Sequence, residues 1–221
     1  PNGAVMFNPK KYLTLFFLFT VLAPASMLWG QNTYVPDDNF EQALIDLNYD
    51  DTLDDYVLTA NISGVTSLDI NNEGISDLTG IEDFTSLTDL NCSNNQLTSL
   101  DVSANTALIE FGCHVNQLTS LDVSANTALT ILSCYMNEIT SLDVSANTAL
   151  TYLNCYYNQL TTLDVSNNTA LTHLDCPSNQ LIHLNMKNGV TDQLNQFEAT
   201  NNPSLGCIEV NAEDVDYATA N

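Results

Sequence analysis

Apolar side chains recur along the middle of the chain at every twenty-first position. The first full unit, residues 87–107, reads LTDLNCSNNQLTSLDVSANTA, and four more follow it in phase to about residue 191. An earlier and slightly longer unit occupies residues 65–86. A unit this short cannot bury its own leucine and cysteine side chains, so the units should stack as a solenoid with one parallel strand each. Leu90, Cys92 and their equivalents are expected to point inward.

An asparagine follows each expected strand at the same interval. This asparagine ladder consists of Asn95, Asn116, Asn137, Asn158 and Asn179. Its members lie where the chain turns and where backbone groups would otherwise be buried without partners. A side-chain amide has donors and acceptors that can satisfy such groups. The ladder is therefore predicted to be scaffold rather than a binding site.

Each unit contains the pattern L-x-x-L-x-C-x-x-N-x-L, which resembles the leucine-rich-repeat signature with cysteine in an allowed core position. The second half of the unit, LTSLDVSAN, echoes the first half, and this nesting resembles the short bacterial subclass called IRREKO repeats. The first unit, from Val65, is closer to the internalin type. The resemblance extends to about Asn202. It implies a secreted bacterial protein with a leucine-rich-repeat solenoid of the α/β repeat class, mainly parallel β with an irregular convex side.

A solenoid exposes its core at both ends and needs caps. Residues 36–47 are predicted to form a short N-terminal capping helix, because apolar residues recur at helical spacing and Asp38 with Glu41 matches a capping box. The chain thus divides into an N-terminal cap at 31–64, repeats at 65–191, and a degenerate last repeat with a truncated C-terminal cap at 192–221. The resemblance also implies that Cys207 has a partner cysteine in a longer chain.

The segment at 1–30 has the order of a signal peptide. Lys10 and Lys11 precede an apolar run at 12–23, which is shorter than the roughly 20 residues of a membrane-spanning helix. Cleavage is expected after Ala25 or after Gly30, and residues 1–5 resemble over-extended reading frame before Met6. This order predicts a secreted or cell-surface protein whose mature chain has no membrane-spanning segment.

The charge of the chain excludes one class of partner. Acidic residues number 27 against 3 basic ones, for a net charge of −24. Nucleic-acid binding depends on lysine and arginine displacing counterions, so nucleic acid is not expected as a partner. The catalytic motifs that place a nucleophile, a zinc-binding histidine pair or a phosphate loop do not occur. The sequence therefore predicts a protein that is not an enzyme and has no cofactor.

Two further ladders could carry chemistry. The five cysteines at 92, 113, 134, 155 and 176 are expected to be buried free thiols, because neighbouring strands lie about 4.8 Å apart and a disulfide prefers a Cβ separation of about 3.8 Å. The aspartate ladder consists of Asp101, Asp122, Asp143 and Asp164. Each carboxylate is expected to accept a hydrogen bond from a turn N–H two residues on. Calcium held between the carboxylates is the alternative. His114 and His173 are too far apart to share a metal ion.

The repeats differ from one another mainly around the expected strands. Scaffold positions must be alike, so the varied positions on the concave strand face are the expected ligand-binding positions. In the middle of this face a tyrosine-rich patch is predicted, with six members: Ile131, Tyr135, Met136, Tyr152, Tyr156 and Tyr157. Exposed apolar and tyrosine clusters commonly mark interaction sites. Alternatively, these side chains only stabilise the sheet by cross-strand pairing.

The predicted function is recognition of a protein partner by the concave face, in adhesion or another surface interaction. A carbohydrate ligand is a second hypothesis, since tyrosine rings also stack on sugars. A third hypothesis is a scaffold that positions a catalytic or anchoring domain beyond residue 221.

Overall fold

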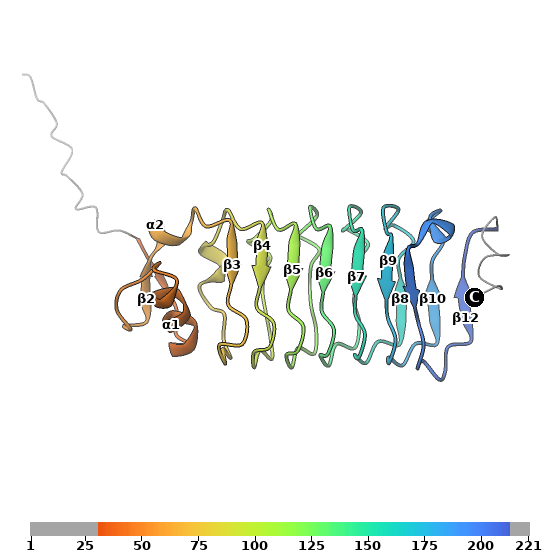
Figure 1. Cartoon of the computed structure of the whole chain (residues 1–221), viewed down its shortest axis with the longest axis horizontal. Helices are drawn as coiled ribbons and strands as arrows, with labels where there is room; N and C mark the ends of the chain where they lie inside the picture. The colour runs from red at the N-terminus through yellow and green to blue at the C-terminus, as the bar shows by residue number, and fades with distance from the viewer. Residues whose placement is uncertain (1–30, 213–221) are drawn as a thin grey trace, which may run out of the picture.

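The computed structural model of the chain describes residues 31–212 and is a solenoid of stacked turns (Figure 1). The signal peptide predicted at 1–30 and the last residues of the predicted C-terminal cap lie outside this range. Each repeat contributes a three-residue strand to a seven-stranded parallel sheet, in the order β11-β9-β7-β6-β5-β4-β3. These strands are β3 (Ser67–Asp69), β4 (Asp89–Asn91), β5 (Glu110–Gly112), β6 (Ile131–Ser133), β7 (Tyr152–Asn154), β9 (His173–Asp175) and β11 (Gln196–Glu198). The predicted leucine-rich-repeat solenoid is confirmed.

A second parallel sheet forms from the other half of the last repeats. Its strands, in the order β12-β10-β8, are β8 (Thr162–Asp164), β10 (His183–Asn185) and β12 (Cys207–Glu209). The equivalent segments of the earlier repeats, such as 99–101, have no strand and no other regular element. The side opposite the main sheet is thus irregular in the first repeats, as predicted, and becomes regular toward the C-terminus.

The core is built from the same position of every repeat. The middle residue of each strand points inward, so that Leu90, Leu132 and Leu153 are buried and Phe111 takes the same place in β5. The five ladder cysteines are buried and free. Burying such side chains against the neighbouring repeats is what stabilises turns that have no core of their own.

The asparagine ladder satisfies backbone groups as predicted. Asn137 is representative: its Nδ2 donates to the carbonyls of Cys113 and Cys134, each at 3.1 Å, and its Oδ1 accepts from the N–H of Leu118 at 3.0 Å. A second ladder, which the sequence analysis missed, consists of Asn105, Asn126, Asn147 and Asn168, all fully buried. The Nδ2 of Asn126 donates to the carbonyls of Val102 and Asn105 at 3.0 and 2.9 Å. Its signal was the same constant spacing from one repeat to the next.

The N-terminal cap covers the first repeat. It comprises β1 (Asn32–Tyr34) and β2 (Tyr56–Leu58), which pair antiparallel, with α1 (Asp38–Asp46) and α2 (Thr59–Ile62). The predicted capping helix is confirmed as α1. The predicted capping box is wrong, because the N-cap residue is Asp37, whose Oδ1 accepts from the N–H groups of Asn39 and Phe40. Two 3₁₀ turns, η1 (Ile81–Asp83) and η2 (Thr191–Gln193), complete the described elements.

Glu41 has a different role from the predicted one. Its side chain is fully buried and accepts hydrogen bonds from the N–H groups of Asp54 and Tyr56 at 2.9 and 3.0 Å. It therefore organises the acidic loop before β2 instead of returning to the helix N-terminus. Within residues 31–212, none of the helices has the length and apolar character needed to span a bilayer.

Candidate functional site

The outer surface of the seven-stranded sheet corresponds to the predicted concave face. Side chains alternate along a strand, so the first and third residues of each strand face outward, while the second is buried in the first six strands and half-buried in β11. The parallel register places equivalent residues side by side, as in the pair Ile131 and Tyr152 of β6 and β7. Outward side chains therefore form rows across the sheet, one member from each repeat.

One of these rows lies just beyond the strands and forms a stack of rings. The ring of His114 lies 4.2 Å from that of Tyr135, with 17° between their planes, and Tyr135 lies 4.7 Å from Tyr156, with 12° between planes. These separations match the distance of about 4.8 Å between neighbouring strands. The solenoid itself thus sets the spacing of the rings, and Tyr135 and Tyr156 are half-buried in the stack.

The next residue of each repeat has a left-handed backbone conformation. The φ values are 54° at Asn94, 54° at Val115, 51° at Met136, 53° at Tyr157 and 53° at Ser178. This conformation suits glycine and asparagine and is strained for a branched or bulky residue. It turns the chain sharply and leaves Met136 and Tyr157 40% and 60% exposed. The backbone therefore does not favour the methionine and tyrosine found at two of these positions, and their exposed side chains contribute little to the core.

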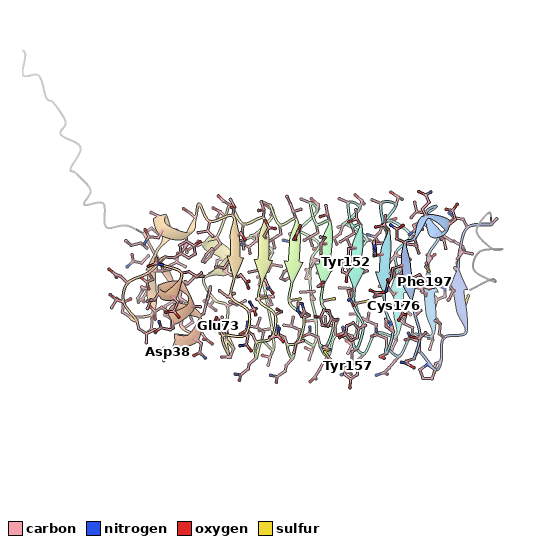
Figure 2. The ribbon with its side chains drawn as sticks, in the orientation of Figure 1. Asp38, Glu73, Tyr152, Tyr157, Cys176 and Phe197 are labelled. Carbon is pink, nitrogen blue, oxygen red and sulfur yellow. The ribbon has the colours of Figure 1, made fainter. Side chains whose placement is uncertain are left out.

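The predicted patch is divided between two positions along the strands, the strand start and the turn after the strand. Ile131 and Tyr152 lie at the start of their strands, whereas the other four members lie beyond the strand ends. Figure 2 shows Tyr152 on the sheet and Tyr157 beyond the ends of the strands, where the chain bends. The structure pairs Ile131 with Tyr152 and Tyr135 with Tyr156. Met136 and Tyr157 occupy equivalent positions of adjacent repeats, and the N–H of Asn137 reaches the carbonyl of Tyr157 at 3.3 Å.

A row that the sequence analysis missed lies between the strand starts and the turns that follow the strands. It contains the third residue of each strand: Asn91, Gly112, Ser133, Asn154 and Asp175. The Nδ2 of Asn154 donates to the hydroxyl of Tyr152 at 3.3 Å, so this row contacts the patch directly. The period-2 alternation of a strand was the signal that could have identified it.

A hollow of about 330 Å³ lies on the same surface over β3 to β6. Gly112 contributes no side chain at its floor, and His114 and Ile131 line it together with three acidic residues, Asp69, Asp89 and Glu110. A Cβ atom at Gly112 would lie 3.4 Å from the Oδ1 of Asn91, which is ordinary contact. One repeat thus has glycine at the hollow where its neighbours have Asn91 and Ser133, so Gly112 leaves room there that a side chain would occupy.

Burial changes the titration of the stacked rings. Burial lowers the pKa of His114, which keeps the imidazole uncharged at neutral pH. Burial, with a smaller effect of Tyr156, raises the pKa of Tyr135. In His114 and Tyr135, burial thus favours the uncharged form of the ring.

The aspartate ladder behaves as a set of turn-forming side chains. Each carboxylate accepts from the serine N–H two residues on, as Asp122 does from Ser124 at 2.9 Å. Hydrogen bonds from the side chain and backbone of Ser124 lower the pKa of Asp122. The predicted turn hydrogen bonds are confirmed, and calcium binding by this ladder stays a prediction.

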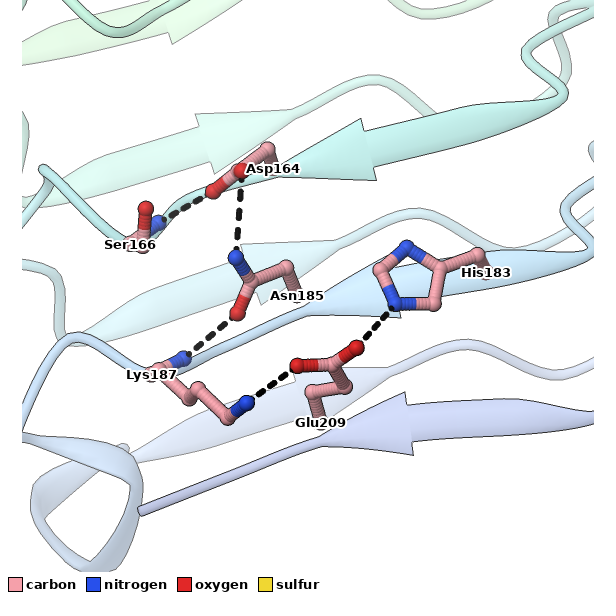
Figure 3. A network of polar contacts seen from close by, with 6 residues as sticks. All are labelled: Asp164, Ser166, His183, Asn185, Lys187 and Glu209. Atoms are coloured by element: carbon pink, nitrogen blue, oxygen red, sulfur yellow. Dashed lines mark hydrogen bonds and ion pairs between the residues drawn. The ribbon is translucent and has the colours of Figure 1, made fainter.

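The described residues bring three ligand atoms of metal-binding types within 4.8 Å of one another at one place, formed by His183, Cys207 and Glu209 on the second sheet. The Glu209 carboxylate already has two partners there: its Oε1 lies 2.9 Å from the Nε2 of His183, and its Oε2 accepts from the Nζ of Lys187 (Figure 3). The side-chain hydrogen bond from Lys187 is the main cause that lowers the pKa of Glu209. The hydrogen bonds of Glu209 to His183 and Lys187 therefore explain why these side chains lie close together.

Comparison with known proteins identifies one close group. Over 78 residues, or 34% of the chain, the sequence is 45% identical to internalin J of Listeria monocytogenes serotype 4b (strain F2365), and the match spans 8% of that protein. The solved functional domain of internalin J from Listeria monocytogenes, described as including a cysteine ladder, matches 82% of the chain with 40% identity and a TM-score of 0.62. The chain covers 38% of that structure. No protein-family model matches the chain.

A more distant likeness supports the fold alone. The structure of an internalin, inlF, from Listeria monocytogenes matches 80% of the chain with 18% identity and a TM-score of 0.50, and the chain covers 83% of it. The buried cysteine ladder of this chain agrees with the cysteine ladder in the description of the more similar internalin J domain. The chain is therefore an internalin-like leucine-rich-repeat protein.

Proposed function

We propose that this chain is an exported binding module and that the outer surface of its seven-stranded sheet recognises a protein partner. The observation that carries the proposal is the pair Met136 and Tyr157. Both are large side chains, both are exposed, and both occupy a left-handed position that favours asparagine or glycine. A large side chain at a strained and exposed position is best explained by a contact outside the fold.

The ring stack supplies a flat surface beside these two side chains. Aromatic pairs of this kind contribute about 0.5–1.5 kcal/mol beyond their buried area, so the stack also stabilises the solenoid. Tyrosines in such rows lose little conformational entropy on binding, because the neighbouring rings already hold them in place. The proposal therefore assigns the stack a double role, in stability and in binding.

Export is the second part of the proposal. It is supported by the order of charge, apolar run and small residues in the segment at 1–30 and by the similarity to internalin J. Sequencing the N-terminus of protein recovered from the culture medium or cell surface tests it. Material that still begins before Lys10 would contradict the proposal.

The binding test separates the patch from the core. A partner protein is first captured with the purified protein and identified. Tyr152→Ala with Tyr156→Ala is then expected to weaken its binding by about 2 kcal/mol or more, the size of an interface hot spot. The same pair should cost less stability than Leu153→Ala, which empties a core position and should cost about 2–5 kcal/mol of unfolding free energy.

A second pair of variants tests an exposed residue of the patch that lies outside the ring stack. Tyr157→Ser changes a side chain that is 60% exposed, so it should reduce binding with almost no change in unfolding. Ile182→Ser is the matched control, because Ile182 is 56% exposed and directly precedes β10 of the second sheet. If Tyr157→Ser binds like the wild type, or if both variants lose binding equally, the sheet surface is not the recognition face.

A further inference from the structure

The acidic hollow over β3 to β6 is not explained by the tyrosine-rich patch. Its three acidic residues occupy outward positions of three neighbouring strands, with Asp69 on β3, Asp89 on β4 and Glu110 on β5. Asp89 and Glu110 are paired directly in the parallel register. Like charges on neighbouring strands, which lie about 4.8 Å apart, repel each other even at the dielectric constant of water.

No cation within residues 31–212 forms an ion pair with these carboxylates. The hydrogen bonds to two of them come from neutral donors: the hydroxyl of Thr88 donates to Asp89 at 2.6 Å, and the side-chain amide of Asn71 donates to Asp69 at 2.7 Å. The ion pairs found within residues 31–212 both involve Glu209, on the second sheet. His114 lines the hollow, but burial lowers its pKa and so favours the uncharged imidazole. The hollow is therefore a site of unbalanced negative charge, and a cation from outside the chain would relieve the repulsion.

The shape of the hollow selects among cations. A metal ion needs ligand atoms that converge on one point, but the described carboxylates of Asp69, Asp89 and Glu110 do not form a set within 4.8 Å of one another. A guanidinium group has five N–H donors in a planar fork and can reach separate carboxylates at once. Its flat face also stacks on an aromatic ring, and His114 forms the end of the ring stack at this hollow.

We infer that the hollow over Gly112 receives an arginine side chain of the partner protein. The inference rests on the proposed function and adds the chemistry of the partner. The guanidinium group lies between the carboxylates of Asp89 and Glu110, and the apolar stem of the side chain packs on Ile131. Gly112 is the specificity-determining residue, because any larger residue there would occupy the space.

A substitution at Gly112 can fill the hollow with little strain on the backbone. Gly112 has no positive φ, and a Cβ atom added there would meet Asn91 at 3.4 Å and His114 at 3.7 Å, so Gly112→Asn restores the residue that β4 has in this row. Gly64→Asn is the matched control, since a Cβ at Gly64 has no atom within 4 Å. The contribution of negative charge is tested with Glu110→Gln. Its control is Glu138→Gln, because Glu138 is exposed and does not line the hollow.

The experiment uses small probes in place of the partner. The amide of acetyl-arginine is titrated into ¹⁵N-labelled protein at low salt, and the backbone amide signal of Gly112 is followed. We expect saturable binding in the millimolar range, at least fivefold weaker binding of the acetyl-lysine amide, and at least tenfold weaker binding of the uncharged acetyl-citrulline amide. Gly112→Asn and Glu110→Gln should each weaken arginine binding at least fivefold, and the two control variants should leave it unchanged.

The inference has several ways to fail. Citrulline binding as tight as arginine binding would exclude charge recognition, and lysine binding as tight as arginine binding would exclude the guanidinium assignment. Equal binding by wild type and Gly112→Asn, or an equal loss in Glu138→Gln, would exclude the hollow as the site. Because no partner protein is used, each of these outcomes is distinct from a failure of the Tyr157→Ser test, which is measured on the partner alone.

Discussion

At the scale of single residues, the ladder cysteines are core side chains. Burial raises the pKa of the Cys92 and Cys134 thiols to about 12, so almost none of either is thiolate at neutral pH. Cys207, in contrast, is exposed on β12. The five ladder cysteines therefore pack as small apolar side chains, and reactivity is confined to the end of the solenoid.

This difference predicts a simple labelling pattern. In the folded reduced protein, a thiol reagent should modify Cys207 quickly and the five ladder cysteines only as slowly as the repeats open. Mass spectrometry of digested peptides measures this. Unfolding in guanidinium chloride is the control and should make all six cysteines reactive. Rapid modification of several ladder cysteines in native buffer would show that the stacked core is open.

The asparagine ladder predicts a large effect for a small chemical change. Asn137→Asp removes two N–H donors that serve the carbonyls of Cys113 and Cys134 and introduces a carboxylate among buried groups. Leaving such acceptors without partners should cost about 2–4 kcal/mol of unfolding free energy at neutral pH. Urea unfolding measures it.

Asn94→Asp is the matched control, because Asn94 is exposed and its Nδ2 reaches only the hydroxyl of Ser93, at 3.4 Å. The left-handed conformation of Asn94 also tolerates aspartate. A change of less than about 0.5 kcal/mol is expected. Equal losses in the two variants would mean that the buried amide is not what stabilises the ladder.

At the scale of elements, Asp37 joins the cap to the first repeat. Its Oδ1 caps α1, and its Oδ2 accepts from the N–H and hydroxyl of Ser76, each at 2.8 Å, and from the N–H of Asp77 at 3.0 Å. Burial opposes ionisation, but the hydrogen bonds from Ser76, Phe40 and Asp77 outweigh it and lower the pKa of Asp37. One side chain thus links two elements that are far apart in the sequence.

Asp37→Ala is expected to destabilise the protein by about 1–3 kcal/mol, since it removes both the helix cap and the bridge to the first repeat. Asp38→Ala is the control: Asp38 lies in the first turn of α1, and its loss should cost no more than about 0.5 kcal/mol. Thermal unfolding of the two variants measures the difference. If Asp38→Ala costs as much as Asp37→Ala, the assignment of the cap is wrong.

The contribution of Asp37 should also depend on pH. Its pKa is lower in the folded state, so the stabilisation is fully present above the ordinary value of 3.8 and is lost as the pH falls through the folded value. The gap in stability between wild type and Asp37→Ala should therefore narrow below about pH 4. A gap that stays constant to lower pH would show that the charge of Asp37 is not involved.

At the scale of the whole molecule, charge repulsion opposes the stacking of repeats. The net charge is −24, and the aspartate ladder places one exposed carboxylate on each of four consecutive repeats. Salt screens such repulsion, because the Debye length falls from about 30 Å at 0.01 M to about 8 Å at 0.15 M ionic strength. The fold should therefore be more stable at physiological salt than at low salt.

We expect the unfolding temperature to rise by several degrees between about 0.01 and 0.2 M NaCl, which corresponds to about 1 kcal/mol or more. Calorimetry measures this, and an unchanged or lower unfolding temperature would contradict the role of repulsion. Adding about 1 mM CaCl₂ to the high-salt buffer tests the aspartate ladder. No further rise is expected from turn-forming carboxylates, whereas a site that holds calcium would give one.

The repeat period by itself determined the scaffold. It identified the strands of the seven-stranded sheet, the buried positions such as Leu153, the cysteine ladder and the asparagine ladder, because every repeat must present the same groups to its neighbours. It did not predict the second sheet of β8, β10 and β12. The helix of the cap followed from its own apolar spacing. The capping residue did not, because Asp37 was distinguished from Asp38 by contacts with Ser76 and Asp77, which come from another element.

Only the tertiary structure decided how the outward positions combine. Sequence variation marked Tyr135, Met136 and Tyr156, but the distance between repeats arranged the rings into a stack, and a left-handed bend turned Met136 outward. The hollow over Gly112 depends on side chains from four strands, and no single repeat contains it. Periodicity reports what each repeat shares, whereas a binding surface is formed by the differences between repeats once they are placed side by side.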